Sequence, residues 1–313
     1  MGPQIDQHLS ISVSSVADLQ VGESRLRFRA LDAASTGLLT AWMPEWRPPT
    51  DQEPAVAVDL ETVDSLLQLS ARSILVKLPG VQYSKSGSCL AITTEAAVGA
   101  LLAGEHRIQF RWLQDNQAAA IEALNTCLYP LLSLAMARHG MHSIHAASVS
   151  IEDSAVVILG PSGAGKSTLA GLMADLGATF MSDDTSFVVK GSKLAGIGDY
   201  NRPRTGAAPG RESDRNRPRI HRPNDVRLLP VKCVVALRRG HHDVATTRTM
   251  PPGELMSWLL KSGTFGMDSE TDVDRLGVLG SLASSVPGVV VSLGGQRPTD
   301  DMVRDWMSSG GRA

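Results

Sequence analysis

The sequence has few of the residues that mark specialised folds or locations. Three of its 313 residues are cysteine, Cys89, Cys127 and Cys233, and their positions show no paired spacing. Scattered cysteines argue against a disulfide framework and are typical of a reducing compartment, where small buried side chains are their ordinary role. The formal net charge is −2, so no overall charge attracts nucleic acid or an anionic membrane.

Signals for export or membrane insertion are also missing. Residues 1–6 have neither a basic start nor an apolar signal core, and no uncharged apolar run reaches the roughly 20 residues of a spanning helix. We therefore expect a soluble, cytoplasmic protein without a membrane partner. Hydrophobic residues make up 42% of the chain, enough for one large domain or for a domain of about 200 residues and a smaller one.

Residues 1–115 predict a separate β-rich α+β domain. Short runs that alternate polar and apolar residues indicate an antiparallel sheet with one wet face, and we expect a helix near Glu95–Leu102 and a loop over Met43–Pro54. No catalytic constellation stands out, so this domain is expected to bind substrate or a partner, or to form a homo-oligomer; a plain packing role is equally open. The alternating runs are residues 11–14, 25–29, 55–58, 73–76 and 107–110.

The second predicted domain, residues 116–313, begins with a helical pattern. Apolar residues recur at steps of three and four from Asn116 to His139. Pro130 predicts a kink or a break into two helices, and Gly140 predicts the end of the helix. Alternating strands and helices further on favour a layered α/β domain. They are a strand at 228–237, helices at 251–264 and 272–285, a strand at 288–293, and a helix at 300–308 capped by Thr299 or Asp300.

A complete phosphate-binding loop lies near the middle of the chain. The spacing G-x-x-x-x-G-K-[ST] follows a short apolar run suited to a buried strand, Ala155–Leu159, and precedes a predicted helix from Lys166 to Leu176. Glycines let backbone amides face a phosphate chain, and the helix N-terminus adds partial positive charge. Lys166 is expected on the β- and γ-phosphates and the Ser167 hydroxyl on Mg²⁺. The alternative is a strand-to-helix turn without a ligand. The loop residues are Gly160, Pro161, Ser162, Gly163, Ala164, Gly165, Lys166, Ser167 and Thr168.

A histidine precedes the loop by 15 positions. The segments 148–151 and 155–159 predict a hairpin, which would fold His145 back toward the loop. His142 and His145 are weaker candidates for metal ligands, because no cysteine or second histidine cluster accompanies them. A histidine satisfied inside the core is the other interpretation.

Two carboxylates, Asp183 and Asp184, follow a predicted strand at Thr179–Ser182. Alternation along a strand points them in opposite directions, which favours different duties. One would hold Mg²⁺, and the other would orient the acceptor hydroxyl and receive its proton. Aspartates also favour turns and helix caps, so a purely structural pair is the alternative.

Taken together, His145, the loop from Gly160 to Ser167 and the Ser182–Asp184 segment resemble the C-terminal domain of HPr kinase/phosphorylase and its HPr-kinase-like relatives. The resemblance covers about 45 residues strongly. It implies an α/β P-loop kinase domain related to HPr kinase and phosphoenolpyruvate carboxykinase, with ATP and Mg²⁺ as cofactors and a serine hydroxyl as acceptor. It also implies Asp183 as the base, with Asp184 then left for the metal, and His145 as an active-site histidine.

Two departures from the family bear on the substrate. The family has an acidic residue soon after the loop serine, where this chain has Thr168, and the family's glutamate is missing from the Gly-rich segment Leu194–Gly198. HPr is therefore a doubtful substrate, and the layout is closer to the enzymes of peptide biosynthetic clusters, including kinases of lasso-peptide precursors. A kinase of a free serine-like molecule and a nucleotide-binding regulator without transfer are the alternatives.

An arginine-rich segment follows the Gly-rich segment Leu194–Gly198. It is rich in Pro and Gly, and we expect a long lid-like loop in which one or two guanidinium groups clamp the nucleotide or an acidic acceptor. Nucleic-acid binding is the competing interpretation, but Tyr200 is the one aromatic residue near it, so we expect no nucleic-acid partner. A solvated basic loop is the simplest alternative. The arginines are Arg202, Arg204, Arg211, Arg215, Arg217, Arg219, Arg222 and Arg227.

Overall fold

The computed structural model describes most of the chain and divides it into two compact units. The first comprises Met1–Leu19 and Arg25–Leu132, and the second Gln20–Ser24 and Ser133–Ala313. The first unit therefore runs past the domain boundary predicted at residue 115. The described residues are 15–21, 24–42, 51–66, 73–86, 89–102, 106–113, 117–182, 185–197, 228–239, 245–263, 269–293 and 298–308.

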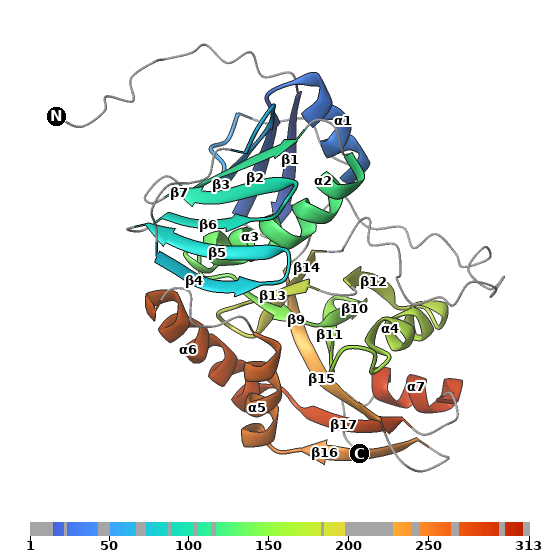
Figure 1. Cartoon of the computed structure of the whole chain (residues 1–313). Helices are drawn as coiled ribbons and strands as arrows, with labels where there is room; N and C mark the ends of the chain where they lie inside the picture. Colours follow the sequence, from blue (N-terminus) through green and yellow to red (C-terminus); the bar gives the residue numbers. More distant parts are fainter. Residues whose placement is uncertain are drawn as a thin grey trace. The chain divides into compact units, whose positions relative to one another are not determined.

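The first unit is built on an eight-stranded sheet in the order β1-β2-β3-β8-β7-β6-β5-β4 (Figure 1). The sheet is mixed, because β2, β3 and β8 pair in parallel, whereas an antiparallel sheet was expected. A parallel pair needs a crossover, and helix α1 between β2 and β3 provides it. The strands are β1 Ser15–Val21, β2 Ser24–Ala30, β3 Val56–Val63, β4 Ser73–Leu78, β5 Val81–Ser86, β6 Cys89–Thr93, β7 Ala97–Leu102 and β8 Arg107–Leu113.

Strand β7 corrects the helix expected near Glu95–Leu102. It pairs antiparallel with β6 and β8, and five of its six residues are buried. A Cβ atom on Gly99 would lie 2.8 Å from Leu131 Cδ1, so the glycine allows the following helices to pack closely on the strand. This tertiary contact, rather than local helix propensity, decides the element.

The helical pattern after residue 116 is confirmed, and a π-helical turn near Pro130 interrupts its regular geometry where a kink or a break was predicted. The helices are α1 Ala33–Trp42, α2 Gln117–Ala123 and α3 Tyr129–Ala137, and the π-helical turn η1 Leu124–Leu128 ends two residues before Pro130. The stretch Ala118–Ala137 is long and apolar enough to cross a membrane, by length and composition alone. It was not predicted from the sequence, because Glu122 interrupts the uncharged run. Within this stretch 65% is buried in the protein, as is also usual for a core helix.

The second unit is a layered α/β structure around a nine-stranded sheet in the order β12-β10-β11-β15-β14-β13-β9, with β17 joining β15 to β16. Strands β11, β15 and β17 are parallel, and β10 and β11 form the predicted hairpin. The strands are β9 His142–His145, β10 Ala147–Ile151, β11 Ser154–Leu159, β12 Thr179–Ser182, β13 Thr185–Val189, β14 Lys193–Ile197, β15 Leu229–Arg239, β16 Thr246–Met250 and β17 Gly288–Leu293.

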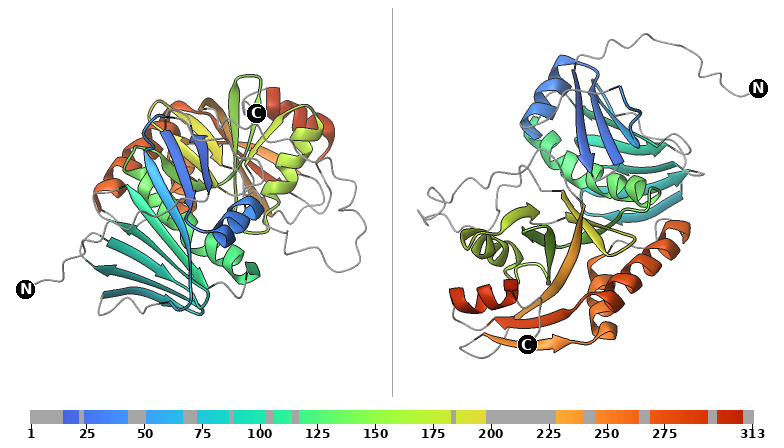
Figure 2. Two further views of the ribbon diagram at one scale, coloured as in Figure 1. Left: turned by 90° about the horizontal axis from the view of Figure 1, so that it is seen from above. Right: turned by 180° about the vertical axis from the view of Figure 1, so that it is seen from behind.

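Helices cover both faces of this sheet. Val156 and Ile158 of β11 share a core with α4 and α7, while Val157 and Leu159 share a core with α5 and α6. Figures 1 and 2 show the two helix pairs on opposite sides of β15. The predicted C-terminal helices are confirmed, and the Thr299 hydroxyl accepts a bond from the Met302 amide at 3.3 Å as the expected cap. The helices are α4 Lys166–Asp175, α5 Pro252–Ser262, α6 Ser269–Ser285 and α7 Asp300–Ser308.

Candidate active site

The glycine-rich loop joins the end of a buried strand to the start of a helix, as its motif requires. Strand β11 ends at Leu159 and α4 begins at Lys166. Gly163 and Gly165 have φ angles of 75° and 99°, in the left-handed region that favours glycine. Gly165 caps the helix without a side-chain hydrogen bond, which leaves the start of α4 suited to an anion.

The first glycine of the motif serves packing rather than backbone freedom. A Cβ atom on Gly160 would lie 3.2 Å from the carbonyl oxygen of Leu237 and 3.3 Å from its Cβ. Strand β15 therefore runs directly alongside the beginning of the loop. The Ala164 amide then donates to the Pro161 carbonyl at 3.1 Å and closes the turn.

Lys166 lies 7% exposed inside the loop, and its ammonium is held by several acceptors. Nζ donates to the Gly160 carbonyl at 2.9 Å and to the Pro161 carbonyl at 3.4 Å. It also lies 3.0 Å from His145 Nε2, which accepts if the ammonium is the donor. These contacts hold the cation at the mouth of the loop.

His145 ends strand β9 and is exposed, unlike the core histidine that was the alternative interpretation. The hairpin folds it back to the loop, where its ring meets Lys166. In the register of β9 and β13, His145 stands opposite Thr185. The sequence therefore placed this histidine beside the loop correctly, while its role in chemistry stays a prediction.

The core-histidine interpretation applies instead to His142. Its ring is fully buried, and Nε2 lies 2.8 Å from Asp274 Oδ2. Desolvation lowers the pKa of His142, against the opposing effect of the Asp274 hydrogen bond. The buried Nδ1 has no hydrogen-bond partner among the described residues, which suits a neutral ring protonated on Nε2.

Asp183 and Asp184 lie outside the described residues, so their predicted roles remain untested. Their neighbours in the chain are placed: Ser182 ends β12, and its hydroxyl donates to the Thr185 carbonyl at 2.6 Å. Thr185 is the residue opposite His145. Asp183 and Asp184 therefore directly precede Thr185 in the sequence, and Thr185 of β13 pairs with His145 of β9.

Gly196, in the Gly-rich segment 194–198, is required by close packing. A Cβ atom on Gly196 of β14 would lie 2.9 Å from both Met181 Cβ and Ser148 Oγ. The segment Leu194–Ile197 therefore packs tightly against β12 and β10. Gly198 and the arginine-rich segment 202–227 lie outside the described residues.

Of the two predicted Mg²⁺ ligands, only Ser167 lies among the described residues. Ser167 is half-buried in the first turn of α4, directly after Lys166, whereas Asp184, the other predicted Mg²⁺ ligand, lies outside the described residues. Among the residues with assigned positions, no group of three or more His, Cys, Asp or Glu side chains is arranged to hold a metal ion. A hydroxyl next to a phosphate-type loop still fits Mg²⁺ that is shared with a nucleotide.

Sequence reasoning missed one cation at the loop, Arg239. This residue ends β15, and its Nη2 donates to the Gly163 carbonyl at 3.1 Å. The preceding Arg238 turns elsewhere, onto Glu254 at 3.0 Å and over the ring of Trp258 at 5.3 Å. The available signal was an arginine pair at the end of a strand that neighbours the loop strand, because alternation sends one of the two side chains toward the loop.

Comparison with known proteins adds little to this geometry. No family model matches the sequence, and no curated protein matches it. Among solved structures, the HPr(Ser) kinase/phosphatase from Coxiella burnetii aligns over 54% of this chain and 89% of its own, with 15% identity and a TM-score of 0.30. The chain is a mixed α/β protein with two sheets and a strand–glycine loop–helix site in the second.

Proposed function

We propose that this protein is an ATP- and Mg²⁺-dependent kinase that transfers the γ-phosphate to a serine hydroxyl of a peptide or protein. The observation that supports the proposal most is the position of Lys166. It lies at the start of α4 and contacts both the loop carbonyls and His145. A glycine-rich turn without a ligand does not require a buried ammonium that reaches back over its own loop. The family resemblance of the same residues points to the same reaction.

The residues divide the work of holding a nucleotide. Backbone amides at the start of α4 and the Lys166 ammonium bind the phosphate oxygens, and the Ser167 hydroxyl with Asp184 binds Mg²⁺. His145 orients Lys166 through their shared contact. Arg239 fixes the loop at the Gly163 carbonyl. When bound, Mg²⁺ supplies charge neutralisation to the transferring phosphate.

Asp183 is assigned to the acceptor side. It accepts the proton of the serine hydroxyl while the serine oxygen forms a bond to the γ-phosphorus, and the bond between that phosphorus and the bridging oxygen of ADP breaks. The products are the phosphoserine substrate, ADP and a proton on Asp183. The loop amides and Lys166 stabilise the charge on the transferring group.

The proposed acceptor is a biosynthetic precursor peptide, and the proposed location is the cytoplasm. Thr168 and the missing glutamate of the 194–198 segment separate the chain from enzymes that act on HPr.

A transfer assay tests the proposal. Purified protein is incubated with radiolabelled ATP, Mg²⁺ and serine-containing peptides, each matched with a serine-to-alanine control, and with free serine. We expect label on the serine peptides alone, and a loss of about 10²–10⁴-fold for Asp183→Asn with nucleotide binding retained. Transfer to free serine in preference to every peptide would overturn the peptide assignment, and unchanged transfer by Asp183→Asn would remove this residue from the base role.

A further inference from the structure

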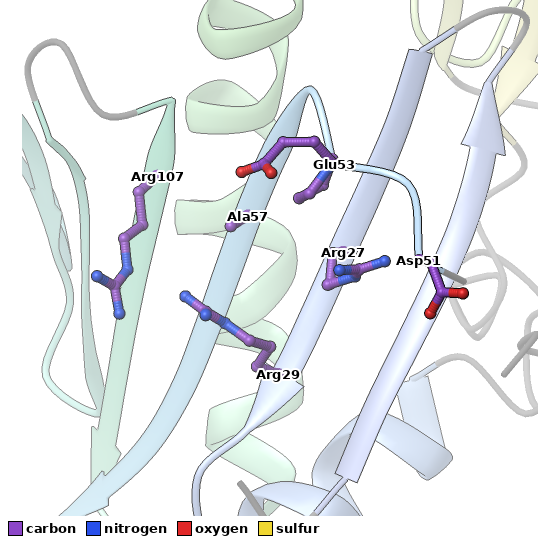
Figure 3. Close-up of a pocket in the computed structure, with 7 residues that line it drawn as sticks. Arg27, Arg29, Asp51, Glu53, Ala57 and Arg107 are labelled. Atoms are coloured by element: carbon purple, nitrogen blue, oxygen red, sulfur yellow. The ribbon is translucent and has the colours of Figure 1, made fainter. Parts of the chain in front are cut away.

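A second charged site lies in the first unit, far along the sequence from the glycine loop. It is a cavity of ≈ 430 Å³ on the polar face of the parallel strands β2, β3 and β8 (Figure 3). Nothing in the proposed kinase chemistry uses it. Its lining residues are Arg27, Arg29, Asp51, Glu53, Pro54, Ala57 and Arg107.

The sheet register creates the cavity. Ala57 of β3 stands directly between Arg27 on β2 and Arg107 on β8. The small alanine side chain forms the floor, and long side chains from the two flanking strands form the walls. A large residue at position 57 would fill the space, so the hollow depends on this one side chain.

One end of the cavity is positive. Arg29 donates to both carboxylate oxygens of Asp59, at 2.6 and 3.0 Å, and Arg107 bonds to the same carboxylate. Asp59 is only 4% exposed, whereas the two arginine side chains are 30% and 34% exposed. Two guanidinium groups thus share one buried carboxylate, and Figure 3 shows them pointing toward one another. The surplus positive charge and the fixed donors suit a carboxylate on a ligand.

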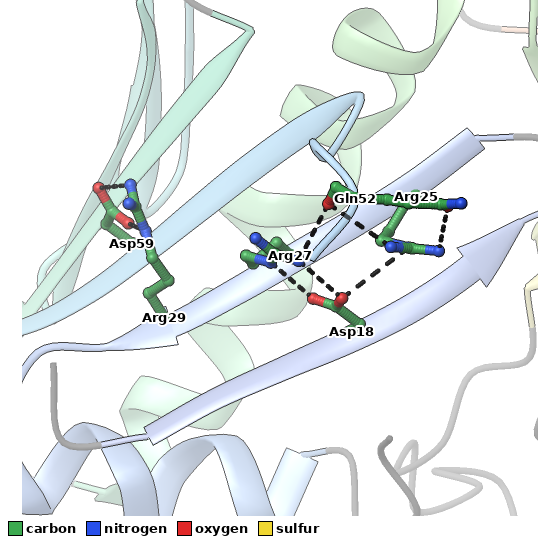
Figure 4. A network of polar contacts seen from close by, with 6 residues as sticks. All are labelled: Asp18, Arg25, Arg27, Arg29, Gln52 and Asp59. Atoms are coloured by element: carbon green, nitrogen blue, oxygen red, sulfur yellow. Dashed lines mark hydrogen bonds and ion pairs between the residues drawn. The ribbon is translucent and has the colours of Figure 1, made fainter. Parts of the chain in front are cut away.

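The other end is negative. Asp51 and Glu53 are exposed on the segment before β3, and their charges act on Arg27, whose pKa they help to raise. The nearest fixed cation, Arg27, is already forked onto Asp18 at 2.9 and 3.0 Å, beside Arg25 and Gln52 (Figure 4). Hydrogen bonding to Asp18 is the main reason that the pKa of Arg27 is raised above its ordinary value. The rim carboxylates therefore suit an ammonium group on a ligand.

The whole site is close to neutral although its ends are charged. The four arginines Arg25, Arg27, Arg29 and Arg107 are matched by the four carboxylates Asp18, Asp51, Glu53 and Asp59. A polyanion such as a nucleotide would meet the two rim carboxylates, whereas a molecule with one negative and one positive end matches both. Of the lining residues that the structure describes, only Pro54 and Ala57 are apolar, so an apolar ligand gains little.

We propose that this cavity binds a small zwitterion of the α-amino-acid type, with its carboxylate on Arg29 and Arg107 and its ammonium near Asp51 and Glu53. The same pair of charges occurs in a free amino acid and in adjacent acidic and basic side chains of a peptide. The cavity holds either source, and the experiment distinguishes them.

Calorimetric titration of the full chain tests the site without any measurement of phosphate transfer, so its result is independent of the proposed kinase activity. The probes are the free L-amino acids, their methyl esters, their N-acetyl derivatives, and a terminally blocked glutamyl-lysine amide. We expect at least one free amino acid or the blocked dipeptide to bind, and we expect neutralising either charge of the ligand to weaken binding about tenfold or more. Preference for the blocked dipeptide identifies a peptide source, and preference for the free compound identifies a metabolite.

Variants locate the binding. Arg107→Gln and Ala57→Leu should each weaken binding about tenfold, because the first removes a donor and the second fills the cavity. Arg111→Gln is the matched control, since Arg111 lies on the same strand and pairs with Glu61 outside the cavity. Glu53→Gln should weaken the free amino acid but leave its N-acetyl derivative unchanged. Circular dichroism verifies that each variant folds.

Three results would overturn the proposal. They are no binding of any probe up to about 10 mM, equal binding of the N-acetyl derivatives, or an unchanged affinity in folded Ala57→Leu.

Discussion

The two charged sites of this protein are assembled in opposite ways. At the glycine loop, Lys166 contacts groups 6 and 21 positions away, in the loop itself and at the end of β9, the strand before the hairpin. In the cavity of the first unit, Asp59 holds Arg29 and Arg107 across 30 and 48 positions, through the register of three strands. The contacts of Lys166 join residues that are close in the sequence, whereas the contacts of Asp59 form only when the strands of the sheet have paired.

The way each cation is held also differs. The described bonds of Lys166 go to backbone carbonyls and an imidazole, whereas the guanidinium groups of the cavity are forked onto carboxylates. Backbone carbonyls cannot be removed by mutation, so the loop is best tested at the cation. The cavity is best tested at its carboxylates.

The largest expected effect is at Lys166. Lys166→Met should lower phosphate transfer about 10³-fold or more, because the ammonium is the fixed charge at the phosphate-binding loop. Initial rates of label transfer to a serine peptide measure the effect. Lys193→Met, an exposed lysine of β14, is the matched control and should keep wild-type rates. Equal rates in both variants would separate the loop from catalysis.

The cavity carboxylate should matter for stability. Asp59→Asn leaves two guanidinium groups without their buried partner and should lower the free energy of unfolding of the first unit by about 2–3 kcal/mol. The control is Glu61→Gln, because the Glu61–Arg111 pair is 41% and 44% exposed and should contribute less than about 1 kcal/mol. Hydrogen exchange with mass spectrometry reads each unit separately. Similar losses in the two variants would mean that burial of Asp59 adds nothing.

Alanine substitution at two glycines of the second unit should change its stability in opposite directions, because only one of the two is closely packed. Gly196→Ala places a Cβ atom 2.9 Å from Met181 Cβ and should destabilise the unit by about 1–2 kcal/mol. Gly171→Ala, in the middle of α4 with nothing within 4 Å of its Cβ, should stabilise it by about 0.5–1 kcal/mol. Urea denaturation compares the variants, and a stabilising Gly196→Ala would refute the tight contact.

The smallest effect concerns pH. Because burial lowers the pKa of His142 below its ordinary value of 6.5, the unfolded state binds a proton that the folded state resists, so stability is present above pH 6.5 and is lost as pH falls below it. We expect the free energy of unfolding to fall as the pH drops from 7 to 5.5, and we expect His142→Gln to remove this dependence. The Asp274 carboxyl, whose pKa His142 lowers, adds a separate loss at more acidic pH. An unchanged pH profile in the variant would exclude His142 as its cause.

Features that depend on residues close in the sequence could be predicted, whereas features that depend on long-range strand pairing could not. The hairpin β10–β11, the glycine loop, α4 and the approach of His145 were predictable, because short-range spacing fixes them. The parallel pairing of β2, β3 and β8 and the strand β7 were not, since they depend on register and on Leu131 packing over Gly99. Arg239 and the cavity were missed for the same reason, because each needs strands to be placed side by side before its partners meet.

Protection of amides from hydrogen exchange on addition of Mg²⁺ and ATP tests the central claim most directly. The account predicts slower exchange over residues 160–168, with no change in β2, β3 and β8, and loss of this protection in Lys166→Met. Unchanged exchange over the loop, or protection confined to the strands of the first unit, would contradict it.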